Sequence, residues 1–205
     1  MLSIKIGGSL LGNRKLTNFL KIIVQEKRKC VLIPGGGVFA DTVRQQQQEL
    51  KFDNLTAHNL SVLSMLKVGY ILKDRITKNY CQIVKITNQL SHSEKCNIYI
   101  WNPEQEICSV KNIYTNWSTT SDTIALKVSR QINSEVLIII KSCEIPSEQK
   151  NNQSLKLNER KAIELSKINI LDKAFPHAFM ECLFPVYVIS INQLKLFKEL
   201  LRNFQ

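Results

Sequence analysis

Two short segments of this chain are apolar at every position, and this feature constrains the fold more than any other. They are CVLIP at 30–34 and the VLIII stretch within 135–141. A strand with one face in water alternates apolar and polar residues, whereas a continuous apolar run is typical of a parallel sheet covered on both faces. Parallel neighbours need long, usually helical, crossover connections. The two runs therefore predict an α/β fold.

The rest of the chain alternates between strand-like and helix-like segments. Its patterns predict further strands at 2–6, 81–86, 97–101, 107–114 and 185–190, and helices at 15–29, 38–51, 54–76, 120–132 and 192–204. The helix at 54–76 is expected to bury Leu60, Leu63, Met65, Leu66, Val68 and Leu72. Residues 146–161 are polar and read as a loop. We expect one three-layer α/β/α domain with a largely parallel central sheet, spanning residues 1–205.

The composition excludes some classes of protein and leaves others open. The net charge of +11 comes from 28 Lys and Arg against 17 Asp and Glu. Nucleic acid is one explanation, but the basic residues are scattered and form no block. Anionic small substrates such as nucleotides, or a general bias toward Lys and Asn, explain the charge equally well. No apolar run approaches the roughly 20 residues that span a bilayer, and no signal peptide is evident. We expect a cytoplasmic protein with neither a nucleic-acid nor a membrane partner.

The six cysteines lie far apart and form no C-x-x-C pair, so zinc-ribbon and redox spacings are absent. Several occur inside apolar runs. They are predicted to be reduced, buried thiols that act as small hydrophobic side chains.

Two glycine-rich turns follow predicted strands and precede predicted helices. Gly7 and Gly8 follow the first strand, and Gly35, Gly36 and Gly37 follow the second. Ligands of open α/β sheets bind beyond the carboxyl ends of the strands. Glycines there let backbone N–H groups approach an anion, and a helix N-terminus adds positive potential. A tight turn that packs a strand against the next helix would explain either glycine-rich turn alone. The two turns together favour two binding sites for phosphate-like groups.

Three charged side chains adjoin these turns. Lys5 lies two residues before Gly7 in an apolar strand, so its amine points to the mouth of the turn and needs an anionic partner. Lys141 ends the VLIII strand, where a lysine that snorkels to water is a fair competing explanation. Asp122 lies in the first turn of a helix capped by Ser121 or Thr120, where a carboxylate is also favoured by the helix dipole. Two lysines and a carboxylate between two anion-binding sites suit phosphoryl transfer, which depends on positioning and charge neutralisation.

The motifs KIGGSLL, IPGGGVFADTVR and TTSDTIALKVS ahead of EVLIIIKS resemble, in this order, the amino acid kinase family. That resemblance implies an α/β/α sandwich that transfers the γ-phosphoryl group of ATP to a carboxylate or a phosphate. The pattern FADTVR, then FDNLTAH, then a Met on the next helix, with LDKAFPHAF later, resembles a short branch associated with methanofuran synthesis. In that branch the acceptor is [5-(aminomethyl)furan-3-yl]methyl phosphate and the product is its diphosphate.

The resemblance also implies roles for individual residues. Lys5 would neutralise charge on the transferred group, and Asp122 would orient that lysine. The ATP phosphates would be held by Gly7, Gly8, Ser9, Ser121, Lys141 and Ser142. The phosphorylated acceptor would be bound by Gly35, Gly36, Gly37, Asp41, Arg44, Thr56 and His58. Where most relatives have an Asp-Gly loop after the strand, this chain has CEIPSEQKNN, so no adenine-binding residue is predicted.

The resemblance further implies a homodimer, and the chemistry implies Mg²⁺ beside ATP, since a cation offsets the charge of the transition state. No residue is predicted as a metal ligand. Other acceptors stay open, namely UMP, isopentenyl phosphate or a carboxylate such as acetylglutamate. A non-catalytic ligand-binding relative is the alternative from another class.

Overall fold

A seven-stranded sheet forms the centre of the protein. The computed structural model describes residues 1–76, 81–85, 96–111, 115–146 and 155–204. The strands run in the order β3-β4-β2-β1-β5-β7-β6. All neighbouring pairs are parallel except the pair of β6 with β7 at one edge. The strands are β1 (Leu2–Ile6), β2 (Cys30–Pro34), β3 (Cys81–Val84), β4 (Ile98–Trp101), β5 (Val136–Lys141), β6 (Leu155–Lys156) and β7 (Val186–Ser190).

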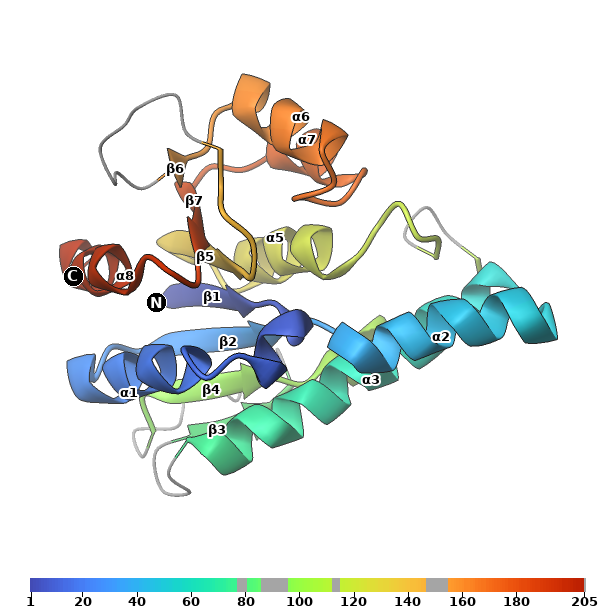
Figure 1. Cartoon of the computed structure of the whole chain (residues 1–205), viewed down its shortest axis with the longest axis horizontal. Helices are drawn as coiled ribbons and strands as arrows, with labels where there is room; N and C mark the ends of the chain where they lie inside the picture. Colours follow the sequence, from blue (N-terminus) through green and yellow to red (C-terminus); the bar gives the residue numbers. More distant parts are fainter. Residues whose placement is uncertain (77–80, 86–95, 112–114, 147–154, 205) are drawn as a thin grey trace.

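Helices cover both faces of this sheet, as Figure 1 shows. The helices are α1 (Leu16–Glu26), α2 (Gly37–Leu50), α3 (Asn54–Arg75), α5 (Ser121–Gln131), α6 (Glu159–Lys167), α7 (Phe175–Phe179) and α8 (Leu194–Asn203), with short 3₁₀ turns η1 (Gly8–Gly12) and η2 (Pro103–Glu106). One face packs against α1 and α8, and the other against α5, α6 and α7. The predicted three-layer α/β fold with a largely parallel sheet is confirmed.

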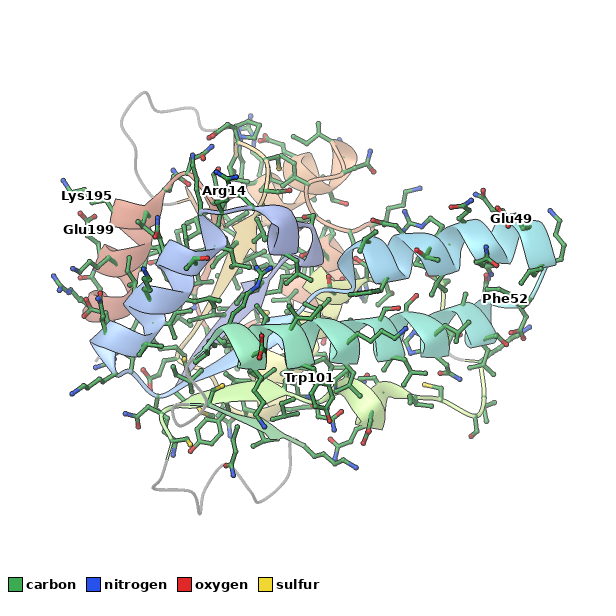
Figure 2. All side chains as sticks on the ribbon, turned by 60° about the horizontal axis from the view of Figure 1, so that its bottom comes forward. Arg14, Glu49, Phe52, Trp101, Lys195 and Glu199 are labelled. Atoms are coloured by element: carbon green, nitrogen blue, oxygen red, sulfur yellow. The ribbon has the colours of Figure 1, made fainter. Side chains whose placement is uncertain are left out.

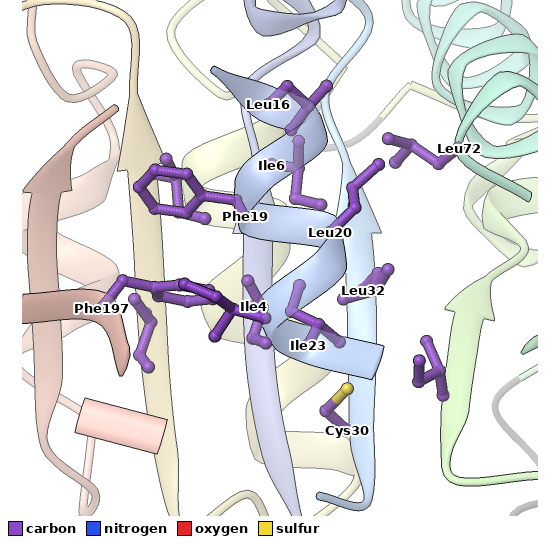
Figure 3. Packing of buried hydrophobic residues seen from close by; sticks show 14 of the residues in the cluster. Ile4, Ile6, Leu16, Phe19, Leu20, Ile23, Cys30, Leu32, Leu72 and Phe197 are labelled. Carbon is purple, nitrogen blue, oxygen red and sulfur yellow. The ribbon is translucent and has the colours of Figure 1, made fainter. Parts of the chain in front are cut away.

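Alternate residues of each strand enter two separate apolar cores. In β1, Leu2, Ile4 and Ile6 pack toward α1 and α8, where the rings of Phe19 and Phe197 stack with centroids 4.7 Å apart (Figure 3). The neighbouring strands send their other residues to the core beneath α5, α6 and α7. Lys5 is directed to this second side, because residues of a strand alternate between faces. Because of this alternation, Lys5 can contact only the helices on the second side of the sheet.

Helices α2 and α3 form a hairpin that projects beyond the carboxyl ends of the strands (Figure 1). Figure 2 shows Glu49 and Phe52 at its far end, on the opposite side of the molecule from α8. The prediction that Leu60 and Leu63 are buried is wrong, since they are 38% and 39% exposed. Apolar residues occupy more than one side of α3, so periodicity alone does not identify the buried side.

The latter half of the chain departs most from the sequence predictions. No strand forms over 107–111, and the rest of that predicted strand lies outside the described residues. The polar stretch at 146–161 contains the short strand β6 and the first turn of α6, while 147–154 lie outside the described part. The edge strand needs little apolar sequence, because one side of it has no neighbour. Helix α6 buries few residues, so its sequence reads as polar.

The cysteines are all free, as expected, but only two of them are buried. Cys30 and Cys81 lie in the core, whereas Cys143 is exposed and the others are intermediate. Burial raises the pKa of the Cys30 thiol to about 12, which keeps it protonated and inert. Within the residues described, no helix combines the length and apolar character needed to cross a membrane.

Candidate active site

The two glycine turns are in direct contact. A Cβ atom added to Gly8 would lie 2.1 Å from the backbone nitrogen of Gly37, and one added to Gly35 would lie 2.8 Å from the nitrogen of Gly8. Gly37 has a φ of +54°, which other residues rarely adopt. The Gly35 N–H donates to the Ile6 carbonyl at 2.8 Å and so ties the second turn to the end of β1. Close approach of two backbones therefore explains Gly35 and Gly37, whereas a Cβ on Gly36 would lie 2.5 Å from the Ala40 side chain.

A buried cluster of two lysines and one aspartate lies beside this contact. Lys5 Nζ is 2.7 Å from Asp122 Oδ1, and Lys141 Nζ donates to Asp122 Oδ2 at 2.6 Å. The three side chains are 4%, 14% and 5% exposed in the order Lys5, Lys141 and Asp122. Neighbouring strands β1 and β5 present the lysines, and the first turn of α5 presents the carboxylate between them. The competing explanations, a Lys141 side chain that snorkels to water and an Asp122 carboxylate favoured only by the helix dipole, do not account for this pairing.

Electrostatics hold the carboxylate of this cluster in its ionised form. Burial by itself would raise the pKa of Asp122, but the charges of Lys141 and Lys5 outweigh it and lower that pKa to about 2. Burial lowers the pKa of Lys5 from its ordinary value, and the Asp122 charge opposes this shift. The site thus contains a lysine whose proton is held less tightly than usual and a carboxylate fixed in its charged form.

Asp172, which the sequence did not single out, caps the helix that carries Asp122. Its Oδ2 accepts the N–H groups of Thr120 and Thr123, each at 3.0 Å, together with the Thr120 hydroxyl at 3.0 Å. The Thr123 hydroxyl donates to Oδ1. Thr120 occupies the N-cap position, one of the two that were predicted, but its side chain makes no capping hydrogen bond within the helix, and Asp172 serves that purpose instead. The only sequence signal was the motif LDKAFPHAF, in which Asp172 is the acidic residue.

A cavity of about 540 Å³ opens over the cluster, and we call it the large cavity. The turn after β1, the starts of α2 and α5, the end of β5 and residues 169–173 line it. Its charged side chains are Lys5, Arg44, Lys141, Lys173, Asp41, Asp122 and Asp172. The N–H groups of Gly8 and Ser9 begin η1 without an intrahelical acceptor. The large cavity therefore offers cations and free backbone donors to an anion.

A second hollow of about 170 Å³, called here the small pocket, adjoins the large cavity. Gly36, Gly37, Asp41 and Arg44 line both spaces, together with residues at the start of α5. The remainder of the small pocket is formed by α3, including His58, and by the segment before α5. Two ligands bound in these spaces would meet at the glycine contact.

Trp117 holds Arg44 at the wall between the two spaces. The Arg44 guanidinium lies 4.4 Å from the centre of the Trp117 ring, a cation–π contact. Trp117 Nε1–H donates in turn to Gln47 Oε1 at 2.6 Å. Sequence analysis missed Trp117, although an isolated Trp just before the TTSD motif was a visible signal.

The remaining predicted residues lie at different distances from this centre. Ser142 accepts a hydrogen bond from the Ser9 hydroxyl at 3.2 Å, at the rim of the large cavity. Gly7 lines the cavity, but its N–H points to the Ile140 carbonyl at 3.4 Å and is not free for a ligand. Thr56 is exposed in the first turn of α3, donates its N–H to Asp53, and lines neither space. Gly35 and Ser142 also line neither space, although each contacts a residue of the turn after β1, whereas Thr56 lies apart.

Comparison with known proteins identifies the family of this chain. Residues 2–144 match the amino acid kinase family, and the chain belongs to that family. It is 27% identical over 190 residues to the [5-(aminomethyl)furan-3-yl]methyl phosphate kinase of Methanocaldococcus jannaschii, covering 91% of this chain and 86% of the relative.

Solved structures of the same fold include two nucleotide kinases. The UMP kinase of Bacillus anthracis aligns with a TM-score of 0.71 at 16% identity, over 98% of this chain and 91% of that one. The uridylate kinase of Archaeoglobus fulgidus aligns with a TM-score of 0.69 at 16% identity, over 96% and 95% of the two chains. Family membership identifies the protein as a kinase, and hence as a phosphotransferase.

Proposed function

We propose that the protein is an ATP-dependent kinase that adds the γ-phosphoryl group to a phosphate monoester. The proposed acceptor is [5-(aminomethyl)furan-3-yl]methyl phosphate, and the product is its diphosphate, an intermediate of methanofuran-type cofactor synthesis. One observation carries the proposal. A lysine ammonium is buried against Asp122 in the large cavity, close to the contact of the two glycine turns, and the small pocket shares a wall with that cavity.

The large cavity suits the triphosphate of ATP. Phosphate oxygens need cations and N–H donors, and Lys5, Lys141 and the starts of η1 and α5 supply both. Asp172 accepts the N–H groups of Thr120 and Thr123. The N–H groups of Ser121 and Asp122 are therefore left for a ligand. Residues 169–173 line the same cavity and are candidates to contact the nucleoside.

The small pocket suits the acceptor. Its phosphate would lie at Gly36 and Gly37, where the start of α2 adds positive potential, with Arg44 beside it. An acceptor oxygen then forms a bond to the γ-phosphorus while the bond to the β–γ bridging oxygen breaks. Lys5 neutralises charge on the group in transfer, and Asp122 holds Lys5 and Lys141 in position. Such catalysis needs alignment and charge stabilisation rather than a covalent nucleophile.

The residues present fit Mg²⁺ only if the nucleotide phosphates supply most of the metal's ligands. Within the described residues there is no cluster of three or more His, Cys, Asp or Glu side chains that could hold a metal ion. Asp122 and Asp172 are already engaged by lysines and threonines, whereas Asp41 lines both cavities. Mg²⁺ commonly binds through one or two carboxylates, water and substrate phosphates. Bound in this way, it would neutralise phosphate charge.

The choice of acceptor rests on the relative named above and on the pocket. The Methanocaldococcus jannaschii relative is named for this furan phosphate. The small pocket presents a carboxylate, Asp41, which would attract the aminomethyl group. The homodimer implied by the family resemblance stays a prediction.

An acceptor panel tests the proposed function. Purified protein is incubated with ATP, Mg²⁺ and one of four acceptors: the furan phosphate, UMP, isopentenyl phosphate or acetylglutamate. ADP release measures turnover, and ³¹P NMR identifies the phosphorylated product. We expect the furan diphosphate to form with the highest kcat/KM. A preference for another acceptor would replace the proposed substrate, and no ADP release above the acceptor-free background would contradict kinase activity on this panel.

A further inference from the structure

The imidazole of His58 has one nitrogen engaged and one free. Its Nε2 lies 2.9 Å from the backbone carbonyl oxygen of Glu106. A carbonyl only accepts hydrogen bonds, so the neutral ring carries its proton on Nε2 and a lone pair on Nδ1. No described residue donates to Nδ1. His58 also lines the small pocket, so a ligand bound there lies beside the imidazole ring.

The partner of Nε2 is held firmly. Asn59, the next residue of α3, donates to the Cys108 carbonyl at 2.9 Å and accepts the Cys108 N–H at 3.0 Å. This reciprocal pair fixes the segment after η2 against α3. The Glu106 carbonyl therefore stays opposite the ring and keeps the tautomer defined.

A second polar group at the small pocket also lacks a partner. Ser61 is one helical turn from His58 on α3, and its Oγ is buried without a hydrogen bond to any residue that the structure describes. An unsatisfied buried hydroxyl is unfavourable, and a ligand that bonds to it removes that cost. Ser64, farther along α3, differs: its hydroxyl donates to the Leu60 carbonyl at 2.8 Å.

We propose that His58 Nδ1, Ser61 Oγ and the Asp41 carboxylate form a subsite that selects acceptors bearing a primary amine. An ammonium group has three N–H donors and no acceptor, and these three groups supply three acceptors in one pocket. The inference rests on the proposed function and deepens it, because it names the groups that separate the aminomethyl acceptor from phosphates without an amine. Gly36 and Gly37 line the same pocket for the phosphate end.

Nitrogen-15 NMR of histidine-labelled protein at mildly alkaline pH tests the tautomer and the ligand without requiring turnover. The His58 signals are assigned by comparison with His58→Gln, whose side-chain amide can still donate to the Glu106 carbonyl. We expect the Nε2–H tautomer. We also expect the Nδ1 resonance to shift on addition of the furan phosphate, but not on addition of an analogue with a methyl group in place of the aminomethyl group. An Nδ1–H tautomer, or equal shifts with both compounds, would overturn the proposal.

Binding affinities measured by calorimetry provide a second test of the subsite. His58→Gln and Ser61→Ala should each weaken binding of the furan phosphate about 10-fold and leave binding of the methyl analogue within about 2-fold. The matched control Ser64→Ala should change neither affinity. Equal losses for both compounds would make His58 and Ser61 structural and overturn the subsite. If the amine is selected but no phosphate is transferred, the subsite stands and the proposed kinase function fails.

Discussion

Lys5 and Asp122 form a buried ion pair between the first strand and the helix that follows the middle of the chain, with Nζ and Oδ1 2.7 Å apart. Lys141 occupies the other oxygen of the same carboxylate. One aspartate thus positions two ammonium groups at the mouth of the glycine contact.

Asp122→Asn removes the charge that compensates two buried lysines. We expect the free energy of unfolding to fall by about 3 kcal/mol, because an unpaired buried ammonium is costly. Urea unfolding measures it. Glu181→Gln is the matched control, since Glu181 pairs with Arg130 where both side chains are about half exposed; it should change stability by less than about 0.5 kcal/mol. Equal losses in the two variants would argue against the buried cluster.

The same carboxylate predicts a stability change in acid. Its folded pKa of about 2 lies below its unfolded value, so its contribution is complete above about pH 4 and is lost as pH falls through about 2. Between pH 5 and 2, wild-type protein should lose about 2 kcal/mol more stability than Asp122→Asn. Urea unfolding at a series of pH values gives the comparison, and parallel curves would refute the lowered pKa.

Gly8→Ala should separate the two turns. The new Cβ would lie 2.1 Å from the Gly37 nitrogen, and backbone at that distance has to move. We expect kcat/KM to fall about 100-fold, since small misplacements of reacting groups cost this much. At Gly12 an added Cβ meets nothing within 4 Å, so Gly12→Ala is the control and should keep wild-type activity. An active Gly8→Ala protein would show that the glycine contact is dispensable.

Asp172 is predicted to be a positioning residue that acts through α5 and Lys5. Asp172→Ala removes the cap of α5 and should lower kcat more than 10-fold, whereas Asp172→Asn keeps an oxygen for both N–H groups and should restore most of it near neutral pH.

The pH profile separates positioning from simple capping. Burial lowers the pKa of Lys5, and the Asp172 charge opposes part of that shift, so without this charge kcat should begin its alkaline decline at a lower pH than in wild type. An unchanged profile in Asp172→Asn would leave Asp172 with a purely structural role.

Sequence reasoning identified the centre of the site because its signals are local. Continuous apolar runs identified parallel strands, and parallel strands carry the residues at their ends to one edge of the sheet. That rule was sufficient to bring Lys5, Asp122 and Lys141 together with both glycine turns.

The parts that sequence reasoning missed depend on tertiary contacts. Asp172 acts on a helix about fifty residues earlier in the chain, and no local pattern marks a cap supplied from outside. Trp117 lies outside every predicted element, and its contacts with Arg44 and Gln47 form only when α2 packs against it. The unpaired nitrogen of His58 depends on the Glu106 carbonyl, which only the folded chain brings near.

Single-turnover kinetics of Lys5→Ala tests the central claim most directly, with ATP saturating and protein in excess over the furan phosphate. Loss of the ammonium from the transfer point should slow formation of the diphosphate by at least about 100-fold, the usual cost of one transition-state contact. Lys21→Ala, on the exposed side of α1, should react at the wild-type rate. A folded Lys5→Ala protein that forms the product within a few-fold of the wild-type rate would contradict the role assigned to this lysine.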